Sequence, residues 1–148
     1  MSQLIAVSRL RCENPHLSRQ ASSEVVMQLI RSILALEAAA FGAAAFVHSG
    51  TLIHGYEHSR AAIAESVIGL VLLVGLMTSV TAPRSSRTVG LAAQAFALLG
   101  TFVGIFTIVI GVGPQTKLDI AFHVVLVAGL LTGLAVVARQ STDARSRA

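Results

Sequence analysis

Four long blocks of apolar residues alternate with short polar segments along the chain. The blocks lie at about 26–48, 61–81, 89–112 and 118–138. Each is close to the roughly 20 residues that a helix needs to cross the hydrocarbon core of a bilayer. The segments between them are short, and short connections favour antiparallel neighbours. The pattern therefore predicts an all-α fold, an integral membrane four-helix bundle with up-down-up-down topology.

The polar ends of the chain bound this transmembrane domain, which we place at 25–138. Residues 1–24 are expected to be a cytoplasmic N-terminal segment without a cleavable signal peptide. Within it, residues 2–11 have the pattern of an interfacial helix that Pro15 would end. Residues 139–148 are expected to be a cytoplasmic polar tail.

The distribution of positive charge predicts the orientation. One side of the predicted bundle carries nine arginines, which are Arg9, Arg11, Arg19, Arg31, Arg84, Arg87, Arg139, Arg145 and Arg147. The other side carries only Arg60 and Lys117. Because loops rich in Lys and Arg stay on the cytoplasmic side, both termini are expected inside and the segments 49–60 and 113–117 outside.

Composition supports the membrane assignment and removes several function classes. The chain of 148 residues is 54% hydrophobic and 12% charged, whereas soluble domains carry about 25% charged residues. The net charge of +4 is explained by arginines at helix ends, so nucleic acid is not an expected partner. The single cysteine, Cys12, excludes an intramolecular disulfide and Cys-x-x-Cys redox chemistry.

Ionisable residues inside the apolar blocks are the most informative positions, because they are costly in a membrane unless paired or hydrated. Three pairs of histidine and acid each share a helix face by their spacing. They are Glu37 with His48, His58 with Glu65, and Asp119 with His123. Imidazole suits zinc, copper, iron or nickel, and carboxylates can complete the shell. The sequence therefore predicts an outward-facing His/carboxylate site that binds a transition metal in a redox or metal-handling role.

The predicted metal ligands are His48, His58, Glu65, Asp119 and His123. A haem b held by His48 and His123 is the alternative cofactor, although a haem pocket is usually less rich in carboxylates. A second shell or proton relay is expected from the remaining polar positions, which are Glu37, His54, Glu57 and Gln94.

Three other interpretations remain open. The loop histidines can be solvated residues at a membrane boundary, and Asp119 can be a charge favoured by the helix dipole. Buried carboxylates beside histidines also form proton pathways, so the chain can be an oligomeric proton-coupled transporter. Finally, it can be a non-catalytic subunit of a larger membrane complex. For any homo-oligomer, Gly100 and Gly104 have the spacing of a dimerisation pattern.

A weak internal repeat is visible at an offset of 57 residues. Leu34-Ala35 matches Leu91-Ala92, and Glu37 falls opposite Gln94. A duplicated hairpin would relate the two halves by a pseudo-two-fold axis along the membrane normal.

The stretches HGYEHSRAAIAESVIGL and QAFALLGTFVGIFTIVIGVGPQTKLDIAFH resemble those of small four-span bacterial membrane proteins, which usually have no assigned function. The resemblance covers roughly residues 30–138. It implies a multi-pass protein of the bacterial cytoplasmic (inner) membrane, and it brings no activity, cofactor or site with it.

Overall fold

The computed structural model describes residues 15–145, and the side chains of residues 20–139 within them. The expected interfacial helix at 2–11 lies outside the described residues. The described part is all-helical: four α-helices and one short 3-10 turn, with no strand. The elements are α2 (Pro15–His48), α3 (Ser59–Thr81), η1 (Pro83–Ser85), α4 (Ser86–Val109) and α5 (Lys117–Arg145).

The helix boundaries follow local signals in the sequence. Pro15 opens α2 in the first helical position, where a missing N–H is tolerated. The N-cap of α3 is His58, whose Nδ1 accepts the backbone N–H of Ala61 at 3.2 Å. α3 stops ahead of Pro83, and Gly111, just beyond α4, adopts a positive φ of 77°, as is common after a helix C-terminus.

Two helices extend beyond the expected spans. α2 begins at Pro15 although the first apolar block begins near residue 26, and α5 continues to Arg145 through most of the expected polar tail. The chain is therefore helical on both sides of the predicted first and last membrane boundaries.

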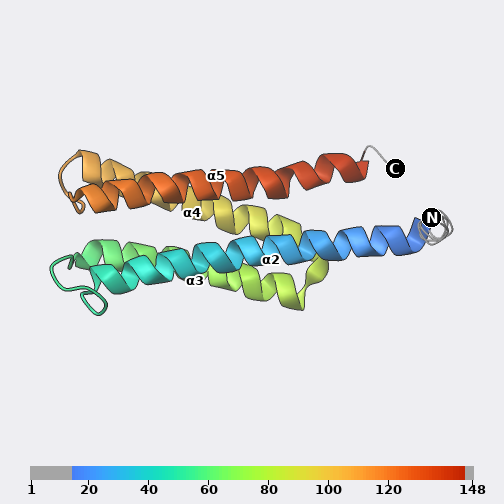
Figure 1. Ribbon diagram of the computed structural model, residues 1–148, viewed down its shortest axis with the longest axis horizontal. Coiled ribbons are helices and arrows are strands. Elements are labelled where there is room, and N and C mark those ends of the chain that lie inside the picture. The colour runs from blue at the N-terminus through green and yellow to red at the C-terminus, as the bar shows by residue number, and fades with distance from the viewer. Residues whose placement is uncertain (1–14, 146–148) are drawn as a thin grey trace, which may run out of the picture.

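The helices run alternately up and down, each beside the next in sequence (Figure 1). α2 also contacts α4 and α5. Two connections, 49–58 and 110–116, lie at one end of the bundle, which we call the loop end. The described chain begins and finishes at the other end, beside η1, and we call this the terminal end.

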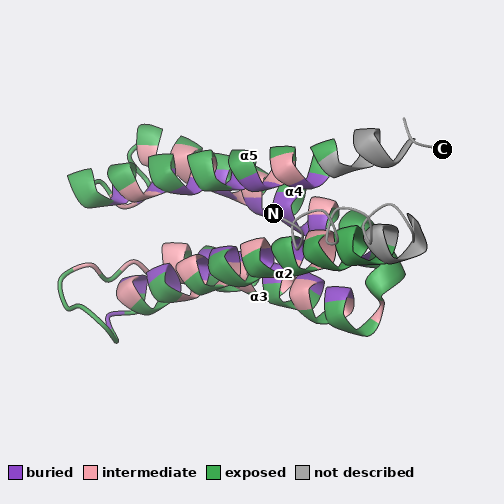
Figure 2. Ribbon diagram, turned by 45° about the vertical axis from the view of Figure 1, so that its right-hand side comes forward, coloured by how far each residue is buried: buried purple, intermediate pink, exposed green. Residues whose placement is uncertain are grey.

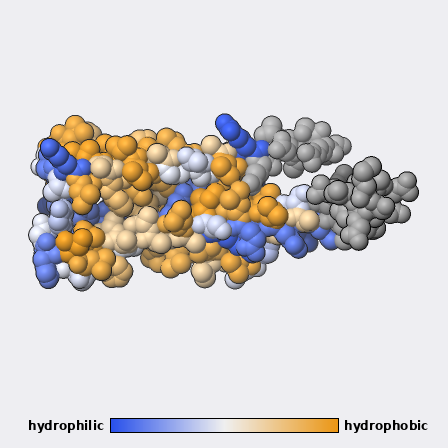
Figure 3. All heavy atoms as spheres, in the orientation of Figure 1, coloured by the Kyte–Doolittle hydropathy of each residue, from blue (hydrophilic) through white to orange (hydrophobic). Residues whose placement is uncertain are grey.

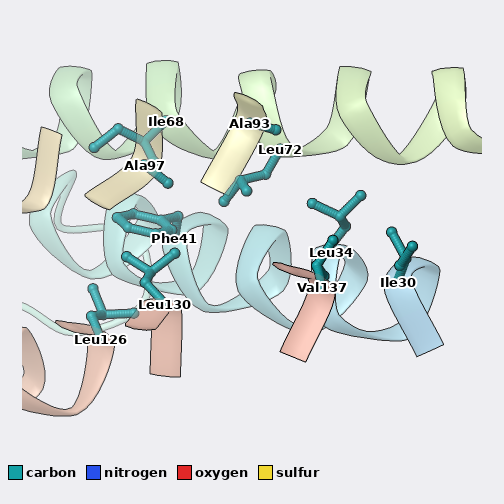
Figure 4. Packing of buried hydrophobic residues seen from close by; sticks show 10 residues of the cluster. All are labelled: Ile30, Leu34, Phe41, Ile68, Leu72, Ala93, Ala97, Leu126, Leu130 and Val137. Carbon is teal, nitrogen blue, oxygen red and sulfur yellow. The ribbon is translucent and has the colours of Figure 1, made fainter. Parts of the chain in front are cut away.

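The interior of the bundle is narrow. Buried residues lie mainly on the helix faces turned toward the other helices, and exposed residues occupy most of the outer faces (Figure 2). One cluster of ten buried apolar residues joins all four helices (Figure 4). Many large apolar side chains, such as Leu36, Phe106 and Val125, are exposed, and apolar residues cover much of the middle of the face shown in Figure 3.

These exposed apolar surfaces fit a lipid environment. Within the described residues, four helical stretches are long and apolar enough to cross a membrane, and they are Gln20–His48, Ser59–Thr81, Pro83–Val109 and Lys117–Arg139. By their length and composition, these helices indicate a multi-pass membrane protein.

Glycines on α4 let the helices approach closely inside one chain. A Cβ at Gly100 would lie 2.7 Å from the Cδ1 of Ile68, and one at Gly104 would lie 3.2 Å from the Nε2 of His123. Gly100 therefore faces α3 and Gly104 faces α5 of the same bundle, so both glycines take part in packing within the chain. A dimer contact through them stays a prediction.

Candidate functional site

His48, the last residue of α2, lies between two acids from other helices at the loop end. Its Nδ1 is 2.7 Å from the Oε2 of Glu65 on α3, and its Nε2 is 3.1 Å from the Oδ1 of Asp119 on α5. The three residues are only 3%, 5% and 6% exposed, respectively. The structure thus joins three helices through one buried imidazole, and we call Glu65–His48–Asp119 the acid–histidine chain.

The start of α5 holds Asp119 in place through a capping box with Thr116. The hydroxyl oxygen of Thr116 accepts the Asp119 N–H at 3.1 Å, and its backbone N–H donates to the Asp119 Oδ2 at 3.2 Å. The Thr116 hydroxyl also donates to Oδ2. Because Thr116 occupies Oδ2, Oδ1 is left to contact His48.

The two contacts of His48 fix the number of protons in the acid–histidine chain. A carboxylate oxygen only accepts, so each close N···O pair needs one hydrogen between its atoms. With no proton on the outer carboxylate oxygens, the chain then holds two protons, either as an imidazolium between two carboxylates or as a neutral imidazole beside one protonated carboxyl. Both states carry one net negative charge, and they differ only in where a proton lies.

His123 sits one turn beyond Asp119 on α5, but it does not join the chain directly. Its Nδ1 lies 2.8 Å from the backbone carbonyl oxygen of Asp119. Because a carbonyl only accepts, Nδ1 must carry the hydrogen, and the neutral ring then has its lone pair on Nε2. This Nε2 lies beside Gly104.

A cavity of about 140 Å³ opens next to Glu65 and His123. Its deep part is lined by buried apolar residues from three helices, including Phe41, Ile68 and Leu126. His58, Arg60 and Val112 line it toward the loop end. The cavity thus connects the inner side of the acid–histidine chain with the loop end.

The other two histidines of the loop end have local structural roles. His58 caps α3 through Nδ1, so its Nε2 carries the hydrogen and donates to the Val112 carbonyl oxygen at 3.2 Å. His54 is almost fully exposed, and its Nδ1 lies 3.6 Å from the Oε1 of Glu57. Hydrogen bonds from the backbone N–H groups of Glu57 itself and of Gly55 lower the pKa of the Glu57 carboxyl.

Glu37 and Gln94 form a separate buried pair halfway along the bundle. The Nε2 of Gln94 donates to both carboxylate oxygens of Glu37, at 3.0 and 3.2 Å. Eleven residues along α2, or about 16 Å, separate Glu37 from His48. The repeat at an offset of 57 aligned these two positions, and the structure places their side chains in contact.

The predicted metal ligands do not converge on one point. Within residues 20–139, no group of three or more His, Cys, Asp or Glu side chains is arranged to hold a metal ion. Both ring nitrogens of His48 and both of His58 are engaged, and the acceptor nitrogen of His123 is turned toward Gly104. A transition metal or haem bound by His48 or His58 would have to replace the hydrogen bonds of these two residues. Metal binding stays a prediction, which elemental analysis and an absorption spectrum of the purified protein test.

Two contributors to the site were missed in the sequence. Thr116 has a recognisable signal, because Thr-x-x-Asp at the start of a helix is the spacing of a capping box. Gly104, whose missing side chain makes room for His123, has no comparable signal in a glycine-rich chain. No protein-family model, no curated protein and no solved structure matches the chain.

Proposed function

We propose that the protein moves protons across the membrane, with the acid–histidine chain as the relay. The observation that carries the proposal is the position of His48, a buried imidazole with each ring nitrogen at hydrogen-bond distance from a carboxylate. Buried acids paired with histidine are characteristic of proton pathways in membrane proteins, and imidazole passes protons near neutral pH.

The transfer needs only a shift of bonds along the chain. Asp119 gives its proton to the Nε2 of His48, so one O–H bond breaks and one N–H bond forms. His48 then releases the hydrogen on Nδ1 to the Oε2 of Glu65. The imidazole is neutral before and after the transfer, and each carboxyl has exchanged its protonation state with the other.

The chain has a wet end and a deep end. Asp119 lies in the first turn of α5, next to Thr116 and Lys117, which are exposed, so it is the group that exchanges with water. Glu65 lines the cavity whose apolar wall lies deeper between the helices, and we propose that it passes the proton on toward the terminal end. A proton would enter at Asp119 and arrive at Glu65.

The proposed orientation follows from the arginines. Arg31, Arg84, Arg87 and Arg139 belong to the terminal end, whereas Arg60 and Lys117 belong to the loop end. The positive-inside rule then places both termini in the cytoplasm and the acid–histidine chain at the outer face. We propose the inner membrane of a bacterium as the location, with an oligomer or a larger membrane complex as the working unit.

Proteoliposomes test the proposal. A potassium gradient with valinomycin sets the membrane potential, and a dye inside the vesicles reports pH. The expected result is proton flux above that of empty vesicles, with a loss of about tenfold or more in His48→Gln, because Gln cannot pass a proton through its side chain.

The loop end offers a matched control for each variant. His54→Gln makes the same change as His48→Gln at an exposed histidine. Glu65→Gln should lose flux as His48→Gln does, and Glu57→Gln is its counterpart at the loop end. Both control variants should retain the wild-type flux. If His48→Gln, folded to wild-type helix content, conducts as well as His54→Gln, or if the wild type conducts no better than empty vesicles, the proposal is wrong.

A further inference from the structure

The cavity beside Glu65 has the size and the lining of a small-molecule site. Its volume of about 140 Å³ is close to that of a cavity of about 150 Å³, lined by Leu, Ile and Phe, that binds benzene in another protein. Phe41, Ile68 and Leu126 form an apolar wall, against which one ring or a short branched chain can pack.

Two polar atoms of residues in this lining make no hydrogen bond within residues 20–139. Oε2 of Glu65 contacts His48, which leaves Oε1 free, and the Nδ1 of His123 is engaged, which leaves Nε2 free. The two residues are 5% and 9% exposed, and both line the cavity. Neither atom is among the fully enclosed, unpaired side-chain atoms of the described residues, which are Arg31 Nε and Gln94 Oε1. Both atoms can therefore be reached from the cavity, and each can accept a hydrogen bond from a ligand that donates one.

The charges around the cavity select among ligands with such a donor. The acid–histidine chain carries one net negative charge, which disfavours an anion. Arg60 lies at the mouth, which disfavours a cation. Both free atoms are acceptors when His123 is neutral, so the complementary group is a neutral hydroxyl.

We infer that this cavity binds a small, neutral, mainly apolar molecule that carries a hydroxyl group, with a phenol as the representative class. The ring packs against Phe41, Ile68 and Leu126, and the hydroxyl donates to Glu65 Oε1 or His123 Nε2. Access is from the loop end, between Arg60 and Val112, which are both exposed. The inference is independent of proton transport, although a bound hydroxyl would contact the deep end of the relay.

Binding to the full-length protein in nanodiscs can be measured by fluorine NMR with 4-fluorophenol and 4-fluorotoluene. The two probes have nearly the same shape, and only the first has a hydroxyl. The wild type should bind 4-fluorophenol saturably and 4-fluorotoluene about tenfold more weakly, which is the effect of one hydrogen bond. Equal affinities of the wild type for the two probes would refute the recognition of a hydroxyl group.

Substitutions at two neighbouring alanines on α3 test where the ligand binds. Ala61 lines the cavity and Ala62 does not, yet both are partly buried. Ala61→Leu should weaken 4-fluorophenol binding about tenfold or more by occupying the cavity, whereas Ala62→Leu should bind as the wild type does. Equal binding by the two variants would place the ligand elsewhere and overturn the inference. Binding without proton flux would refute only the relay, and flux without binding would refute only this site.

Discussion

Gly133 on α5 lies directly against the buried Glu37–Gln94 pair, and alanine at this position should destabilise the bundle. The added Cβ would lie 2.5 Å from the Nε2 of Gln94 and 2.8 Å from the Oε1 of Glu37. It would also lie 2.9 Å from the Cγ2 of Ile33. Because real Cβ contacts are longer than these distances, both polar side chains must move and their hydrogen bonds must break.

The magnitude follows from the contacts that are lost. A buried donor such as the Gln94 amide that loses its partner costs about 1–3 kcal/mol, and replacing Gly by Ala in a helix returns up to about 1 kcal/mol. The expected loss in the free energy of unfolding for Gly133→Ala is therefore about 1–2 kcal/mol. Gly129, one turn earlier on α5, has no atom within 4 Å of an added Cβ, so Gly129→Ala should be neutral or slightly stabilising.

Titration with SDS in mixed micelles, followed by circular dichroism, gives the free energy of unfolding of each variant. A double-mutant cycle then tests the cause. In a Gln94→Ala background the nearest atom is gone, so Gly133→Ala should cost less by about 1 kcal/mol. Equal stability of Gly133→Ala and Gly129→Ala would refute the reasoning, as would an unchanged cost of Gly133→Ala in the Gln94→Ala background.

Three further predictions concern the core, the start of α5 and the loop end. Leu72 is fully buried, so Leu72→Ala should lower the free energy of unfolding by about 2–5 kcal/mol, as measured by the same titration. Thr116→Ala removes the capping box of α5 and should lower it by about 1 kcal/mol, whereas Thr132→Ala, at an exposed hydroxyl that bonds only within its own helix, should leave it nearly unchanged. Because the pKa of Glu57 is lowered in the folded loop, its contribution to stability is present above the ordinary Glu pKa and is lost as pH falls through the lowered value. The amide resonance of Gly55 should shift over that acidic range in the wild type and not in Glu57→Gln.

The four helices could be predicted because hydropathy and length carry the signal directly. Each apolar block is long enough to span a bilayer, and Pro83 and the glycines after α4 mark where helices end. The extension of α2 back to Pro15 and of α5 on to Arg145 could not be predicted, because hydropathy locates the apolar part of a helix and says nothing of its extension into polar sequence.

The partners of the polar residues were harder to predict. Spacing along one helix grouped Glu37 with His48 and Asp119 with His123, but the structure pairs His48 with Glu65 and Asp119 from other helices. Those pairings depend on how each helix is rotated about its axis. A helix that is apolar on all sides carries little information about this rotation, and here close contacts such as that of Gly75 with Ala93 set it.

The polar contacts of α2 include some that explain the register of the helices and one, at His48, that register alone does not explain. Arg31 donates to the Ser79 carbonyl oxygen on α3 at 2.9 Å, and Glu37 accepts from Gln94 on α4. Contacts of this kind fix the register of helices that have no hydrophobic drive to associate in lipid.

The acid–histidine chain adds a third link, from His48 to both α3 and α5, and it retains one net negative charge in either protonation state. Neutral amide side chains at the same three positions could form hydrogen bonds without burying that charge, and replacing buried ion pairs is often neutral or stabilising. Register alone therefore does not explain three ionisable groups in series. The proton exchange that we propose would explain them, because it requires that each group can both hold and release a proton.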